Sequence, residues 1–152
     1  MSRLALAFAT SFGVGYAPVA PGTFGSAAGL LVWAVLPASP AAQVLAAAAV
    51  LALGVWAAGV TERHVRATDP GIVVIDEVLG MLVTLAFNPV SWAGAAVGFV
   101  LFRAFDVIKP YPANRLERLH GGLGIMMDDA MAGVYANVVL KLALALIPAL
   151  RP

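Results

Sequence analysis

Residues 71–87 read GIVVIDEVLGMLVTLAF, an apolar run that is interrupted by two adjacent carboxylates, Asp76 and Glu77. A run of this length is close to the roughly 20 residues that a helix needs to cross the hydrocarbon layer of a bilayer. A charged side chain within such a segment costs about 3 kcal/mol or more unless it is paired, hydrated or bound to a metal. The stretch therefore predicts a membrane helix that carries carboxylates with a function.

The rest of the chain has the same apolar character. Of its 152 residues, 62% are hydrophobic and only 11% are charged, which is about half the charged fraction of an ordinary soluble domain. So few charges cannot cover the surface of a soluble fold, and we expect the apolar excess to face lipid. The net charge of +1 argues against a nucleic-acid partner. The absence of cysteine excludes disulfides, thiolate metal sites and a cysteine nucleophile.

Five segments have about the length of a membrane span, and we expect an all-α, polytopic membrane helical bundle that forms a single domain over residues 1–152. The segments run from about Gly22 to Leu36, Ala41 to Val60, Gly71 to Phe87, Ser91 to Ile108 and Gly124 to Ile147. The first is the shortest and is bounded by prolines. Residues 1–20 carry no convincing cleavage site, so we expect them to be retained as an interfacial helix.

Basic residues divide the connecting loops into two classes. The loops at residues 61–70 and 109–122 contain five of the nine Lys and Arg residues, whereas residues 37–40 and 88–90 contain none. The positive-inside rule then places the two basic loops on the cytoplasmic side. In this topology Lys141 and Arg151 would lie on the opposite side.

Five of the eight acidic residues fall inside the predicted membrane segments, close to the cytoplasmic side. They are Asp76, Glu77, Asp106, Asp128 and Asp129. Ion pairing or a helix dipole could account for any one of them, but a shared site explains all five better because such residues are costly in a membrane. Carboxylates without histidine or cysteine favour a hard cation, and we expect Mg²⁺.

Arg103, Asp106 and Lys109 are spaced i, i+3, i+6 on the fourth predicted helix, which places them along one inclined face. Arg103 and Lys109 could hold phosphate oxygens there while Asp106 holds the metal. The alternative is a ladder of intrahelical ion pairs that shields the charges from lipid. Helix spacing alone leaves both explanations open.

Two glycine-rich segments adjoin the same side of the predicted bundle, PGTFGS at residues 21–26 and GGLG at residues 121–124. Backbone N–H groups at helix N-termini can bind an anion, which makes Thr23 and Ser26 candidate ligands. Glycines at such positions also serve tight turns and close helix packing. His64 and His120 lie in the basic loops, where we expect solvated side chains.

Four ordered motifs carry a resemblance to a known family. They are PGTFGS at 21–26, DPGIVVIDEVLGM at 69–81, FRAFDVIKPYP at 102–112 and HGGLGIMMDDAMAG at 120–133. Together they resemble phosphatidylglycerophosphatase A over about residues 21–135. The resemblance implies a protein of the bacterial inner membrane, and with the predicted spans and basic loops we expect it to be multi-pass, with its active site facing the cytoplasm. It also implies a Mg²⁺-dependent lipid phosphatase that converts phosphatidylglycerophosphate to phosphatidylglycerol and inorganic phosphate in phospholipid biosynthesis.

The family's charged motif residues fall on the positions that the membrane argument selects. On this interpretation the metal ligands are Asp76, Glu77, Asp106, Asp128 and Asp129. We expect Asp76 and Asp129 to be the catalytic residues. We expect the substrate, a membrane phospholipid, to be bound by Arg103, Lys109 and Thr23.

The residues also bear on the mechanism and on a competing function. The sequence has no cysteine, no Asp-x-Asp after an apolar strand and no histidine in a Ser-Gly-His setting. Two mechanisms remain, attack by metal-activated water and attack by an aspartyl nucleophile. Mg²⁺ held by several carboxylates favours water. The alternative function is a small transporter or channel that uses the carboxylates as a cation or proton path. Beyond the carboxylates, such a path would meet only Lys141 and small hydroxyl residues such as Thr84.

Overall fold

The structure is a computed structural model that describes residues 3–116 and 118–152. The described residues form seven α-helices and two short 3₁₀ helices, with no strand among them, which confirms the all-α prediction. The elements are α1 (Arg3–Ala9), η1 (Val14–Tyr16), α2 (Pro21–Val35), α3 (Pro40–Val65), α4 (Ile75–Leu85), α5 (Trp92–Ile108), α6 (Ala113–Leu116), α7 (Gly122–Leu146) and η2 (Pro148–Leu150).

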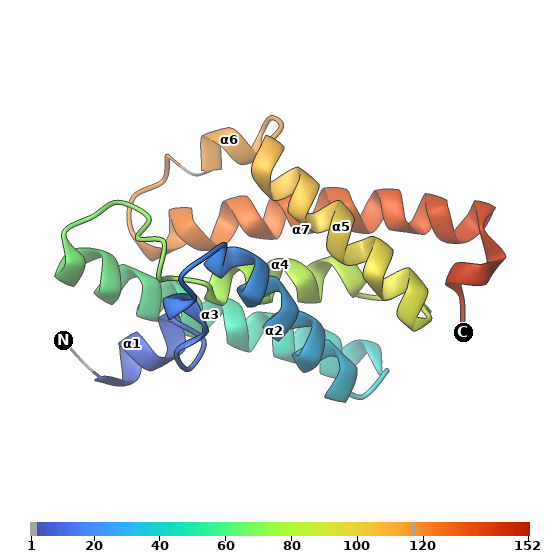
Figure 1. Ribbon diagram of the computed structural model, residues 1–152, viewed down its shortest axis with the longest axis horizontal. Helices are drawn as coiled ribbons and strands as arrows, with labels where there is room; N and C mark the ends of the chain where they lie inside the picture. The colour runs from blue at the N-terminus through green and yellow to red at the C-terminus, as the bar shows by residue number, and fades with distance from the viewer. Residues whose placement is uncertain (1–2, 117) are drawn as a thin grey trace.

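The long helices run back and forth between the two ends of an elongated bundle (Figure 1). α3 finishes, and α2, α4 and α7 begin, in the half of the bundle that contains α1, while α5 rises obliquely and finishes beside α6. Both basic loops are therefore on the side where α4 and α7 begin, while the turns at residues 36–39 and 86–91 are in the other half. This arrangement agrees with the predicted grouping of the loops, and their cytoplasmic orientation stays a prediction.

The prediction of five membrane spans is wrong in its count. Among the described helices, two are long and apolar enough to cross a membrane: α3 with 26 residues and α7 with 25. α4 has 11 residues, and at 1.5 Å per residue it is about 16 Å long, roughly half of the hydrocarbon layer. The apolar run at residues 71–87 is longer than its helix because residues 71–74 lie before the first turn and Phe87, with φ 60°, leaves the helical conformation.

The outer faces of the bundle are apolar. Large side chains that point away from it, at 66% to 83% exposure, include Leu31, Val35, Leu45, Val100 and Leu146. Apolar exposure on this scale is unusual for a soluble monomer and marks a surface that contacts another apolar phase. It agrees with the composition and with two helices of span length.

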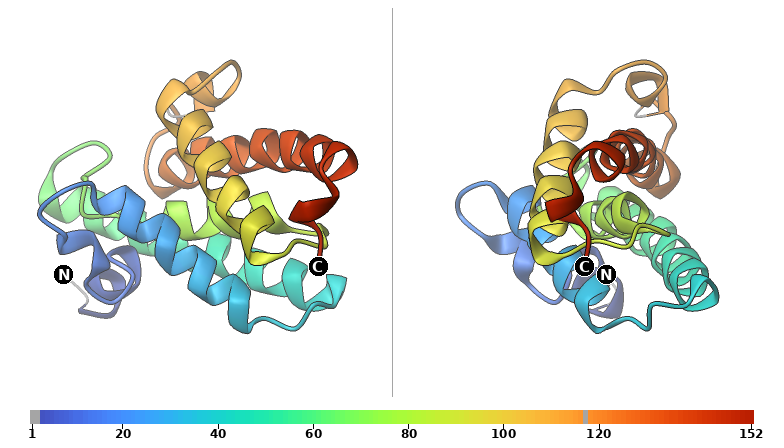
Figure 2. Two further views of the ribbon diagram at one scale, coloured as in Figure 1. Left: turned by 45° about the vertical axis from the view of Figure 1, so that its right-hand side comes forward. Right: turned by 90° about the vertical axis from the view of Figure 1, so that its right-hand side faces the viewer.

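α4 is the central helix, enclosed by α2, α3, α5 and α7 (Figure 2). Nine of its 11 residues are buried, among them Asp76 in the first turn. α2 approaches it closely because its contact positions are glycines: a Cβ atom at Gly25 would lie 2.8 Å from the Cβ of Val74, and one at Gly29 would lie 2.7 Å from the Cβ of Met81. This packing holds the first turn of α4 inside the bundle.

Candidate functional site

An acidic cavity of about 270 Å³ lies at the end of the bundle where α4 and α7 begin. The charged residues on its wall are Asp69, Asp76, Glu77, Arg103, Asp106, Lys109, Asp128 and Asp129. The structure thus brings together all seven charged residues that the sequence selected, six from three helices and Lys109 from the C-cap of α5. It adds Asp69, which sequence reasoning missed although this residue opens the second motif.

Three of the carboxylates form a compact group. Asp76, Glu77 and Asp129 each offer an oxygen, and these oxygens all lie within 4.8 Å of one another. Asp76 and Glu77 occupy the first turn of α4, and Asp129 lies in the third turn of α7. Negative charges at this separation repel one another strongly away from water, so the group needs a positive partner.

The same three residues hold oxygen atoms that no donor satisfies. Oδ1 of Asp76, Oε2 of Glu77 and Oδ2 of Asp129 are buried and have no hydrogen-bond partner. Leaving such an atom unpaired costs about 1–3 kcal/mol, and more for a charged group. A divalent cation would satisfy all three, and an oxygen-only set fits Mg²⁺. The residues present therefore fit the predicted metal.

Asp106 and Asp128 lie on the same wall but are paired with basic side chains. Nη1 of Arg103 donates to Oδ2 of Asp106 at 2.6 Å and lies 3.8 Å from Oε1 of Glu77. Nζ of Lys109 donates to Oδ2 of Asp128 at 2.6 Å. The structure thus gives a group of three carboxylates and two flanking ion pairs, and metal ligation by Asp106 and Asp128 stays a prediction.

The prediction that Arg103, Asp106 and Lys109 share one helix face is correct only for Arg103 and Asp106. α5 ends at Ile108, and Lys109 caps it in a left-handed conformation with φ 46°. Lys109 therefore leaves the helix and reaches across to α7 rather than continuing the line. The alternative of intrahelical ion pairs is correct for one pair, Arg103 with Asp106, which are three residues apart.

The segment PGTFGS contributes to the cavity through its glycine. Gly22 lines the wall, and a Cβ atom there would collide with Oε1 of Glu77 and lie 3.1 Å from Nη1 of Arg103. The buried hydroxyl of Ser26 donates to the Gly22 carbonyl at 2.8 Å and accepts from Arg103 at 3.5 Å. Thr23 is not among the lining residues, and its N–H donates to the Ala20 carbonyl. Substrate binding by Thr23 stays a prediction.

The remaining sequence candidates lie away from the cavity wall. At residues 121–124 the packing alternative is correct, because a Cβ atom at Gly122 would collide with the Val55 carbonyl and lie 2.7 Å from the Gly59 nitrogen. This contact joins the start of α7 to α3. His64 and His120 are exposed, as expected for solvated side chains, but His64 lies in the last turn of α3 rather than in a loop.

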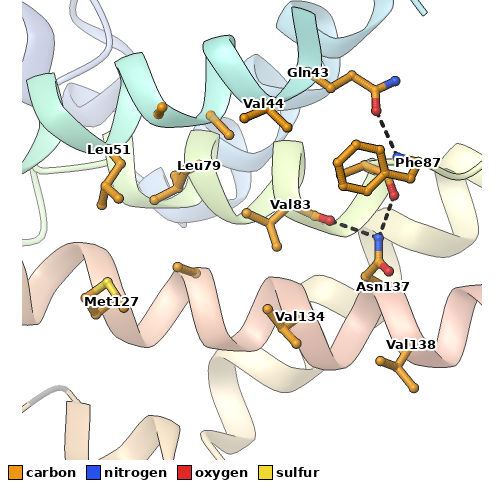
Figure 3. Close-up of a pocket in the computed structure, with 14 residues that line it drawn as sticks. Gln43, Val44, Leu51, Leu79, Val83, Phe87, Met127, Val134, Asn137 and Val138 are labelled. Atoms are coloured by element: carbon orange, nitrogen blue, oxygen red, sulfur yellow. Dashed lines mark hydrogen bonds between the residues drawn. The ribbon is translucent and has the colours of Figure 1, made fainter. Parts of the chain in front are cut away.

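A larger cavity of about 500 Å³ lies between α3, α4 and α7, and Figure 3 shows its wall. Its lining residues are apolar or carry an amide, such as Leu51, Leu79, Val134, Gln43 and Asn137. None of them is charged. Of these two cavities, the smaller, acidic one is therefore the one lined by charged groups that can bind a cation or move a proton.

The acidic cavity can hold a cation and an anion side by side. A cation bound by the three carboxylates would face the guanidinium of Arg103 and the ammonium of Lys109 across the same small space. Arg and Lys bind phosphate oxygens, the first as a planar fork and the second as a point charge. The arrangement suits a phosphate group held between a metal and two basic side chains.

Comparison with known proteins agrees with this chemistry. The family model described as phosphatidylglycerophosphatase A matches residues 7–144. Phosphatidylglycerophosphatase A of Escherichia coli is 38% identical, covering 87% of this chain and 78% of its own length. The protein of the same name from Haemophilus influenzae is 36% identical, covering 86% and 83%.

A third relative, from Bacteroides thetaiotaomicron, bears the provisional name phosphatidylinositol-3-phosphatase. It is 36% identical, covering 93% of this chain and 94% of its own length. No solved structure matches the chain. The family match spans nearly the whole chain and contains every residue of the acidic cavity, so the chain belongs to the phosphatidylglycerophosphatase A family.

Proposed function

We propose that the protein hydrolyses the phosphomonoester of phosphatidylglycerophosphate, releasing phosphatidylglycerol and inorganic phosphate in phospholipid biosynthesis. The observation that carries the proposal is the group of three carboxylates, each with a buried and unsatisfied oxygen, facing Arg103 and Lys109 across one cavity. Family membership and the names of two relatives support the choice of substrate.

In the proposed mechanism Asp76, Glu77 and Asp129 would hold Mg²⁺, which would neutralise phosphate charge and lower the pKa of bound water. Arg103 and Lys109 bind the phosphate oxygens, and their partners Asp106 and Asp128 orient them. Water attacks phosphorus as the bond from phosphorus to the glycerol oxygen breaks, Asp76 or Asp129 accepts a proton from the attacking water, and a proton returns from this carboxyl to the leaving glycerol oxygen, which departs as the alcohol.

The packing beyond the cavity favours hydrolysis over transport. A cation path would have to continue between α4 and α7 from Asp76 and Asp129. There a Cβ atom at Gly133 would lie only 2.6 Å from the Gly80 carbonyl oxygen, and the fully buried ring of Phe102 fills the other side of Gly80. The helix backbones touch at this level, which suits a cavity with one entrance.

The substrate can be tested by phosphate release from purified protein with Mg²⁺. The panel contains phosphatidylglycerophosphate, phosphatidic acid and phosphatidylinositol 3-phosphate, the last because of the name of the Bacteroides relative. We expect phosphatidylglycerophosphate to be hydrolysed fastest. Preference for the inositol lipid would make that second candidate the substrate of the same site, and release from none of the lipids would contradict a lipid phosphatase.

Arg103→Lys is expected to lower kcat/KM by about tenfold or more, because hydrogen bonds to charged groups contribute about 1.5–3 kcal/mol each and a lone ammonium cannot reproduce a fork. Steady-state hydrolysis at varied substrate measures the effect. Arg115→Lys is the matched control, since Arg115 is exposed and stacks over the Tyr111 ring. Equal kinetics for parent, variant and control would remove Arg103 from the site.

We also propose that the protein lies in the bacterial inner membrane as a multi-pass protein, with the acidic cavity on the cytoplasmic side. The two helices of span length and the basic loops at the cavity end support this orientation. The cysteine-free chain allows a direct test. In intact cells an impermeant thiol reagent should label Ser39→Cys and spare Arg66→Cys and Arg115→Cys, and the reverse pattern would invert the orientation.

A further inference from the structure

α4 and α7 run in parallel (Figure 1), and each turns a stripe of three residues toward the other helix. On each helix three residues at i, i+4 and i+8 share one face. The three pairs are Asp76 with Asp129, Gly80 with Gly133, and Thr84 with Asn137. The first pair belongs to the carboxylate group, so the other two determine how the helices that carry it are aligned.

The middle pair brings the backbones together but does not fix the helices along their axes. A Cβ atom at Gly133 would lie 2.6 Å from the Gly80 carbonyl oxygen, and one at Gly80 would lie 3.1 Å from the Asp129 carbonyl oxygen. Glycines allow this close approach. They offer no side chain that would resist sliding of one helix past the other.

Asn137 supplies the contact that resists sliding. Its Nδ2 donates to the carbonyl oxygens of Val83 at 3.0 Å, Thr84 at 3.0 Å and Ala86 at 2.8 Å. Figure 3 draws the bonds to Val83 and Ala86. These carbonyls belong to the last turn of α4 and its C-cap Ala86, where the usual helical donors are missing. The Val83 carbonyl also accepts from the Ala86 N–H, and the Thr84 carbonyl from Nδ2 of Asn88. One side chain of α7 therefore joins the far end of α4.

We propose that Asn137 is a positioning residue for the metal site, because its amide fixes the register of α4 on α7 and keeps Asp76 and Glu77 beside Asp129. A slip of one residue moves a helix by about 1.5 Å, whereas metal–ligand distances tolerate about 0.2 Å. The inference rests on the proposed metal-dependent function. It assigns to Asn137 a role in a site that lies two helical turns away.

The test measures Mn²⁺ binding to purified proteins by the electron paramagnetic resonance signal of free Mn²⁺. Asn137→Leu removes both N–H donors at similar size. We expect it to bind Mn²⁺ at least about tenfold more weakly than the parent, as is typical when a residue that supports a metal ligand is lost. Asn137→Gln keeps the amide and should stay closer to the parent.

Gln43→Leu is the matched control, because the Gln43 Oε1 accepts from the Phe87 N–H just after α4 but belongs to α3. It should keep parental Mn²⁺ affinity. Thermal unfolding without metal verifies that each variant is folded. If Asn137→Leu does not fold, Asn137→Asp replaces it, because aspartate has the shape of asparagine without its N–H groups.

Parental Mn²⁺ affinity in a folded Asn137→Leu or Asn137→Asp protein would overturn the inference. Equal weakening in Gln43→Leu would also overturn it, since the effect would then be general destabilisation. A parent protein that binds no Mn²⁺ would contradict the proposed metal site itself, and this result is separate from the other two.

Discussion

Asp76→Asn and Asp129→Asn are each expected to lower the rate of phosphate release by at least about 100-fold, because loss of a metal ligand removes several kcal/mol of transition-state stabilisation. The amide keeps the shape of the side chain but not its charge. Both residues are buried in the carboxylate group and hold an oxygen without a donor. Turnover per folded protein in detergent measures the effect.

Glu62→Gln is the matched control for these changes, because Glu62 lies on α3 and is not among the residues of the cavity wall. It should leave turnover within about threefold of the parent, as substitutions outside such features usually do. The double variant should be little slower than either single one, since ligands of one centre act as a unit. If the folded amide variants hydrolyse the lipid at parental rates, these carboxylates have a structural role and not a catalytic one.

Gly22→Ala is expected to fold but to lose about 100-fold in turnover, because a displacement of about 1 Å at a reacting centre can cost that much. The added Cβ would collide with Oε1 of Glu77 and lie 3.1 Å from Nη1 of Arg103. Both atoms are the far ends of flexible side chains, so they can move without disturbing the backbone. The change therefore displaces the site and spares the fold.

Gly71→Ala is a closely matched control, since Gly71 lines the same cavity and a Cβ atom there would have no neighbour within 4 Å. Thermal unfolding and steady-state hydrolysis of both variants make the comparison. Equal activity of the two variants would show that the space beside Gly22 is not needed by Glu77 and Arg103.

The helical class and the location of the chemistry could be predicted because both depend on rare residues in an apolar background. Carboxylates such as Asp76 and Asp129 stand out in apolar helices. The basic residues of the loops at 61–70 and 109–122 indicate that these carboxylates lie near the same end of the bundle. The number of spans could not be predicted in this way. Hydropathy counts apolar residues whether or not they are helical, and residues 71–74 and Phe87 are apolar but lie outside α4.

The internal organisation of the site depends on contacts that no local pattern contains. Spacing suggested that Lys109 continues the face of Arg103, but the chain turns at the end of α5 and Lys109 reaches Asp128 instead. Asp69 lies in the loop before α4, where an exposed acidic residue gives no signal that it lines a cavity. Asn137 resembles any polar residue on a helix until its three carbonyl partners are known.

Phosphate release from phosphatidylglycerophosphate after removal of metal tests the central claim most directly. Purified parent and Asp129→Asn proteins are treated with EDTA, transferred to metal-free buffer and titrated with Mg²⁺ or Mn²⁺. The account predicts no turnover without metal, restoration by either ion in the parent, and no comparable restoration in the variant. Full turnover of the EDTA-treated parent without added metal would contradict it.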